Sequence, residues 1–174
     1  GRRLWDSLME MAKIGATPKG GVCRLALTDL DKQGRDLFVR WAKDAGCTIS
    51  VDRMGNVFAR RAGKDNTLTP VVTGSHADSQ PTGGKFDGNY GVLAGLEVVR
   101  TLNDAGITTE APIEVAWWTN EEGSRFVPLP CPGTYFQSVR YDAISDEPDR
   151  AFVERLTQQH GVAAIPFSAF YRDG

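Results

Sequence analysis

The spacing of apolar residues divides the first part of the chain into helical and extended segments. Three segments carry apolar residues at helical spacing and are predicted to be helices: residues 2–14, 28–45 and 92–102. Four shorter apolar runs are predicted to be strands: residues 47–51, 57–59, 70–73 and 113–119. Thr28 and Asp31 form a capping pair at the start of the second helix. The order of elements therefore predicts an α/β fold.

Two local patterns predict how the strands pair. Residues 47–59 are typical of a β-hairpin, because Gly55 lies in the turn between two alternating runs. The strand, helix and strand from Val71 to Thr119 imply a parallel pair with a right-handed crossover. The sheet is therefore expected to be mixed, with its core built on Trp41, Leu96 and Trp117.

The segment between the first two helices, residues 20–28, is expected to be a loop because it opens with Gly20 and Gly21. Arg24 in this loop is expected at the surface, with contact to an anionic substrate group as the alternative. The helix that follows is expected to bury an apolar stripe formed by Leu30, Leu37, Phe38, Trp41 and Ala45.

Residues able to bind metals or move protons follow the ends of predicted strands. They are His76, Asp78, Asp87, Glu121 and Glu122. Sites in α/β sheets are built in the loops at the carboxyl ends of strands. Histidine and carboxylate ligands suit zinc, manganese, cobalt or nickel. Asp78 is spaced to accept the second imidazole N–H of His76. One glutamate of the pair would bind metal while its neighbour acts as general base on a metal-bound water.

Each of these residues also has an ordinary structural explanation. A single histidine at a strand end is most often a loop residue with satisfied hydrogen bonds. Two adjacent glutamates are usually solvated charges, and Asp87 before a helix is most simply an N-terminal cap. The pattern alone therefore leaves a metal site and ordinary loop residues both open.

The sequence also resembles a known family. The resemblance rests on four stretches: GSHADS, GGKFDG, GVLAGLEVVRTLNDAGI and TNEEGSRF. They are similar to the dinuclear metallo-amidohydrolases, which include N-carbamoyl-L-amino-acid hydrolases, allantoate amidohydrolases and β-ureidopropionases. Aminoacylase and carboxypeptidase G are more distant relatives. The resemblance implies part of a phosphorylase/hydrolase-like, three-layer metallopeptidase domain that hydrolyses linear amide C–N bonds.

The resemblance also implies a role for each candidate residue. His76 would bind one of two divalent ions (zinc, manganese, cobalt or nickel), Asp87 would bridge both, and Glu122 would bind the other. Glu121 would be the general base, and Asp78 would orient His76. The family uses two further histidines, whereas the only other histidine of this chain, His160, has no matching motif. We therefore expect a partial site and negligible activity from the chain alone.

The character of the sequence changes after residue 127, where Val127 to Gly133 holds three prolines. Residues 128–174 are expected to form a short β-α-β tail, with strands at 135–141 and 162–165 around a helix. Two stretches, PCPGTYFQSVRYDAISDEPD and GVAAIPFSAFYRDG, are similar to the small-domain end of class I pyridoxal-phosphate aminotransferases. We therefore interpret the chain as a hybrid of two domains, a metallo-amidohydrolase part at residues 1–127 and an aminotransferase-like segment at residues 128–174. The alternatives to a hydrolase are an aminotransferase fragment or a non-catalytic hybrid fragment.

Composition limits the partners. The 174 residues carry a net charge of −2, which gives no reason to expect nucleic acid or an anionic membrane as a partner. We expect no membrane helix and no signal peptide. The three cysteines are widely spaced and are expected to be free thiols in the cytoplasm. The expected partner is a small-molecule substrate. Family members are homodimers, but their dimerisation domain has no counterpart in this sequence.

Overall fold

The computed structural model describes residues 1–123, 127–128, 139–140 and 145–160. The chain forms two compact units, Gly1–Arg125 and Phe126–Gly174. The first unit contains α1 (Arg2–Met11), α2 (Asp29–Asp44), β1 (Thr48–Val51), β2 (Val57–Arg61), β3 (Val71–His76), α3 (Asn89–Asp104) and β4 (Ile113–Trp118). The second contains β5 (Val127–Pro128), β6 (Val139–Arg140) and α4 (Asp149–His160).

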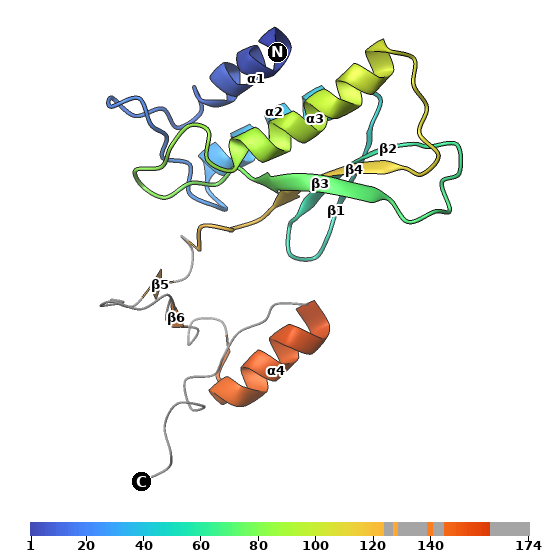
Figure 1. Cartoon of the computed structure of the whole chain (residues 1–174). Coiled ribbons are helices and arrows are strands. Elements are labelled where there is room, and N and C mark those ends of the chain that lie inside the picture. Colours follow the sequence, from blue (N-terminus) through green and yellow to red (C-terminus); the bar gives the residue numbers. More distant parts are fainter. Residues whose placement is uncertain (124–126, 129–138, 141–144, 161–174) are drawn as a thin grey trace. The chain divides into compact units, whose positions relative to one another are not determined.

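The first unit is built on a mixed four-stranded sheet in the order β1-β2-β4-β3. β1 and β2 form the predicted antiparallel hairpin, β2 is antiparallel to β4, and β3 is parallel to β4. Helices α1, α2 and α3 lie on one face of this sheet (Figure 1). The predicted α/β class is confirmed. The described residues of this unit supply two layers of the expected three.

The core lies between the sheet and the three helices. Phe38 of α2 packs on Trp117 of β4, with ring centroids 5.6 Å apart. Leu96 and Trp117 are fully buried, as predicted, and Trp41 is partly buried. Leu30 is exposed, so its assignment to the buried stripe of α2 is wrong. The first turn of this helix buries Asp31 instead.

Several local predictions from the sequence are confirmed. The Thr28 side chain accepts a hydrogen bond from the Asp31 backbone amide and caps α2. The hairpin turn contains Gly55 with φ of +85°, a left-handed conformation that glycine adopts without a steric penalty. Helix α1 is shorter than expected and ends at Met11.

Glycines allow the closest approaches within the sheet and between the sheet and α3. A Cβ atom added to Gly74 of β3 would lie 2.1 Å from the Ala116 carbonyl oxygen of β4. A Cβ on Gly95 of α3 would lie 3.0 Å from side-chain atoms of Thr73 and Val115. At Gly74 and Gly95 the backbone therefore lies too close to the neighbouring strand residues to leave room for a side chain.

In the second unit, β5 pairs with β6 in antiparallel orientation. In α4, Phe152 is buried, and Arg155 forms an ion pair with Glu147, which precedes the helix. The predicted strand at 162–165 and most of the predicted strand at 135–141 lie outside the described residues. The division at residue 127 stays a prediction.

The close contact at Gly74 gives a test of the sheet. We expect Gly74→Ala to destabilise the protein by about 3 kcal/mol, because an added methyl group must push β3 away from a backbone carbonyl. The matched control is Gly84→Ala, where the added Cβ would meet only the Cβ of Asp87 at 3.9 Å. This control should change stability by less than about 0.5 kcal/mol. Urea unfolding of both variants measures the difference, and equal stabilities would contradict the predicted contact.

Candidate metal centre

The candidate site lies where β3 and β4 end together. His76, the last residue of β3, is paired in register with Trp118, the last residue of β4. Because the strands are parallel, the loops that follow them start side by side at one edge of the sheet. One loop runs toward α3 and contains Asp78 and Asp87. The other contains Glu121 and Glu122.

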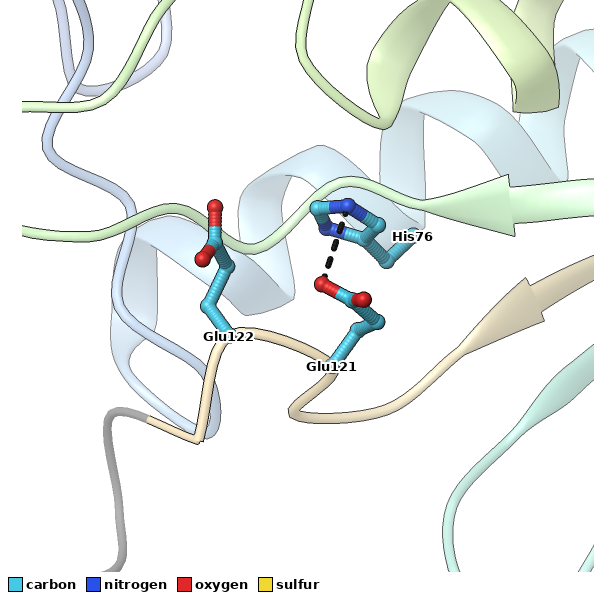
Figure 2. Close-up of side chains that lie close together, drawn as sticks. All are labelled: His76, Glu121 and Glu122. Atoms are coloured by element: carbon cyan, nitrogen blue, oxygen red, sulfur yellow. Dashed lines mark ion pairs between the residues drawn. The ribbon is translucent and has the colours of Figure 1, made fainter. Parts of the chain in front are cut away.

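The two loops bring a histidine and two glutamates together (Figure 2). Ligand atoms of His76, Glu121 and Glu122 all lie within 4.8 Å of one another. The imidazole Nε2 of His76 is 3.2 Å from Glu121 Oε2. The His76 side chain is only 9% exposed, whereas that of Glu121 is 54% exposed. The group is therefore anchored by a buried imidazole and opens toward solvent through its carboxylates.

Asp78 supports this group from behind. Its side chain is fully buried, and its Oδ1 atom lies 3.5 Å from His76 Nδ1. Its Oδ2 atom accepts a hydrogen bond from the Glu122 backbone amide at 3.1 Å. The backbone carbonyl of Asp78 is also 3.1 Å from His76 Nδ1. Asp78 thus turns Nε2 toward the glutamates and joins the two loops.

These contacts shift the protonation of both groups. The Asp78 side chain raises the pKa of His76 to about 9, against the effect of burial, and the charge of Glu121 adds to the rise. Burial by itself would raise the pKa of Asp78, but His76 and the backbone amides of Glu122 and Glu121 hold it below its usual value. With no cation bound, the imidazole therefore carries a proton at neutral pH.

Asp87 is not brought into this group, although the sequence suggested that it would converge with His76 and Glu122. It is exposed, and its carboxylate does not complete a group with them within 4.8 Å. Its turn nevertheless lies against the imidazole, because a Cβ on Gly88 would be 2.6 Å from His76 Nε2. A further carboxylate beside two others would be repelled, which favours the solvent-facing position of Asp87.

The loop after β4 that carries Glu121 and Glu122, called the glutamate loop below, is fixed by residues that the sequence patterns did not indicate. Asn56 Oδ1 accepts a hydrogen bond from the Thr119 amide at 2.8 Å, and Arg35 Nη2 donates to Thr119 Oγ1 at 3.1 Å. Gln80 Nε2 donates to Glu122 Oε2 at 3.0 Å. No periodicity marks these contacts, because they depend on long-range packing of the hairpin turn and of α2.

Arg24 is the clearest departure from expectation. It is completely buried, so neither a surface position nor direct contact with a substrate agrees with the structure. Its guanidinium group donates to the backbone carbonyls of Ala77, Met11 and Ile14. The available sequence signal was its place inside the apolar run VCRLAL, in which Val22 and Ala26 are also buried.

A mixed α/β sheet with a histidine and carboxylates gathered at its strand ends places donor atoms suited to a divalent cation where α/β folds build their sites. Residues 72–161 match the family model for peptidase family M20/M25/M40. The chain belongs to this family. The match extends past residue 127, while the aminotransferase resemblance of the tail stays a prediction.

Individual relatives match most of this chain. The N-carbamoyl-L-amino-acid amidohydrolase of Rhizobium meliloti is 57% identical over 137 residues, covering 79% of this chain and 33% of the relative. A ureidoglycolate hydrolase of Oryza sativa is 35% identical over 151 residues, covering 87% of this chain and 30% of that protein. The chain therefore spans about a third of the length of these relatives.

Solved structures of related proteins also match most of this chain. A hydantoinase/carbamoylase family amidase from Burkholderia multivorans is 80% identical, with a TM-score of 0.72, covering 73% of this chain and 31% of that one. Aminopeptidase PepT of Bacillus cereus shares the fold at 16% identity and a TM-score of 0.57. Among the described residues, no helix is long and apolar enough to cross a membrane.

The protonation of His76 gives a second test. In the metal-free chain, the His76 ring should titrate near pH 9, because Asp78 and Glu121 stabilise its charged form. The pKa is raised on folding, so the stabilising contribution is fully present below about pH 6.5 and is lost as the pH rises through about 9. Imidazole NMR signals followed from pH 5 to 10 measure the titration.

The control for this titration uses the second histidine. His160→Gln leaves one imidazole signal, which assigns His76 directly, and Asp78→Asn in that background should lower the pKa of His76. A His76 signal that titrates near 6.5 in both chains would contradict the assigned role of Asp78.

Proposed function

We propose that this chain is part of a metal-dependent hydrolase that cleaves linear amide C–N bonds in N-carbamoyl-L-amino acids or related ureido compounds. The observation that carries the proposal is the convergence of His76, Glu121 and Glu122, with Asp78 buried behind the imidazole. The names of relatives that share 57% and 35% identity with this chain support the substrate class.

The chemistry of the side chains fits a divalent cation. Asp78 occupies the Nδ1 side of His76, which leaves Nε2 facing two carboxylates in a partly exposed group. Nitrogen and carboxylate donors suit zinc, manganese, cobalt or nickel. His76 and Glu122 would hold such an ion, and Asp87, which faces solvent in this structure, is proposed as a further ligand from the neighbouring turn. When bound, the ion would lower the pKa of water and polarise a carbonyl oxygen.

Glu121 is the proposed general base. In the metal-free protein its carboxylate forms an ion pair with the protonated His76 ring, 3.2 Å from Nε2. His76 would have to be neutral to act as a metal ligand, and without the ring proton the attraction that holds Glu121 to the ring would be lost. The freed carboxylate would then take a proton from the attacking water. As the C–N bond breaks, Glu121 would return this proton to the leaving nitrogen.

Asp78 keeps the geometry constant during this cycle. It remains ionised, because its pKa is lowered by His76 and by backbone amides of the opposite loop. It therefore fixes the direction of the imidazole and the start of the glutamate loop at the same time. The substrate would be a small molecule that approaches the exposed carboxylate side of the group.

The third prediction concerns the 174-residue chain itself. We expect weak cobalt binding, detected by its visible absorption spectrum, that His76→Gln abolishes and His160→Gln leaves unchanged. Three of the five implied ligands are present, and catalytic sites normally use three protein ligands for each zinc ion. Ammonia release from N-carbamoyl amino acids or allantoate should therefore be negligible. Metal-dependent turnover that Glu121→Gln removes would contradict this expectation.

The fourth prediction tests the function directly. In a chimera, residues 1–123 of this chain replace the corresponding segment of the Rhizobium meliloti relative, which is 57% identical to this chain over 137 residues. The chimera should hydrolyse N-carbamoyl-L-amino acids only with divalent metal. Glu121→Gln in the chimera should reduce kcat by about 10²–10⁴-fold, the usual contribution of a general base.

The matched control in the chimera is Glu110→Gln, which removes an exposed carboxylate that pairs only with Lys64 among the described side chains. It should leave kcat within about twofold. A folded, metal-loaded chimera without hydrolase activity would count against the proposed function.

A further inference from the structure

Arg24 is a buried cation at the centre of the loops that form the candidate site. Its side chain donates from Nε to the Ala77 carbonyl at 2.7 Å and from Nη2 to Asn89 Oδ1 at 2.6 Å. The Nη1 atom donates to the carbonyls of Met11 at 3.0 Å and Ile14 at 2.8 Å. One planar group thus connects the end of α1, the loop after β3 and the start of α3.

The backbone of Arg24 strengthens the connection to the loop after β3. Its amide donates to Ser79 Oγ at 2.8 Å, and its carbonyl accepts from the Ser79 amide at 2.8 Å. Arg24 therefore holds both chain neighbours of Asp78, with its side chain on Ala77 and its backbone on Ser79. The position of the Asp78 carboxylate between them is set from both sides.

The same guanidinium also reaches the turn that carries Asp87. Asn89, which accepts from Arg24, donates its own side-chain and backbone N–H groups to the Asp87 carbonyl at 3.1 and 2.6 Å. The turn around Asp87 is thereby connected to the loop around Asp78. A shift of the guanidinium group would move both loops together.

Charge connects Arg24 with the glutamate loop as well. Burial lowers the pKa of Arg24, while Asp31 and Asp78 act in the opposite direction. Asp31 in turn forms an ion pair with Arg35 at 2.9 Å, and Arg35 donates to Thr119, two residues before Glu121. Negative and positive side chains therefore alternate from Asp78 through Arg24 and Asp31 to Arg35, which contacts the glutamate loop. A buried network of this kind is sensitive to the loss of any member.

We propose that Arg24 is a positioning residue of the candidate metal centre, because its hydrogen bonds hold the loop that places Asp78 behind His76 and the turn at Gly88 that lies against the imidazole. This inference rests on the proposed function for its metal readout. The competing explanation is that Arg24 only satisfies the carbonyls at the end of α1, in which case it contributes to stability alone.

The first arm of the test measures metal affinity in the full chain. Arg24→Met keeps the apolar stem but removes every donor of the guanidinium group. The matched control is Arg100→Met. Arg100 is a partly buried arginine of α3 that donates to Ser7 and lies over the Trp41 ring. We expect Arg24→Met to weaken cobalt binding at least tenfold, as for residues that orient metal ligands, and Arg100→Met to change it less than threefold. Arg24→Lys keeps the charge without the planar fork and should fall between them.

The second arm does not need metal. In the metal-free chain, hydrogen exchange of the Ser79 and Glu122 amides reports on the two loops that Asp78 joins. Arg24→Met should accelerate exchange at both amides at least tenfold relative to Arg100→Met at equal thermal stability. If Arg24→Met does not fold, Arg24→Lys and Ser79→Ala replace it in both arms, since the latter removes the acceptor of the Arg24 amide.

The outcomes separate the two proposals. Unchanged exchange at Ser79 and Glu122, or metal affinity equal to that of Arg100→Met, overturns the positioning role of Arg24. If the unsubstituted chain and the chimera both fail to bind cobalt, the proposed function fails. Hydrogen exchange still decides whether Arg24 positions the loops.

Discussion

The buried carboxylate of Asp78 is the contact on which the candidate site depends. The parallel register of β3 and β4 brings two loops to one edge of the sheet, but register alone does not orient their side chains. Asp78 does so by facing His76 with one oxygen and the Glu122 amide with the other. A buried carboxylate is costly unless it is paired and hydrogen-bonded. Because its ion pair comes from the end of β3 and its hydrogen bond from the loop after β4, both contacts form only when the two loops are in place.

Short-range patterns in the sequence were enough to predict most of the first unit. The hairpin around Gly55 and the cap at Thr28 are each specified by a few neighbouring residues, and the parallel strand pair follows from the order of strand, helix and strand along the chain. The candidate residues His76 and Glu121 were found for the same reason, since one lies at the end of β3 and the other in the loop that follows β4. Local rules work where the interaction that decides the structure lies within a few residues of the chain.

The predictions that were wrong concern residues whose positions depend on contacts with distant parts of the chain. Arg24 is buried because carbonyls from separate segments meet around it, and no local pattern records their meeting. Leu30 is exposed because the first turn of α2 uses its inward position for Asp31, which pairs with Arg35. The place of Asp87 depends on the charges around it more than on its distance from His76 in the sequence.

The raised pKa of His76 also bears on how the protein matures. Small zinc domains often cannot fold without their ion, because their ligands repel one another or remain unpaired in its absence. In this chain a proton on the imidazole offsets the neighbouring carboxylates, so the metal-free arrangement carries its own internal counter-charge. The folded arrangement therefore balances these charges without a cation. At the proposed metal centre a divalent cation would displace this proton, so a lower pH would favour release of the cation.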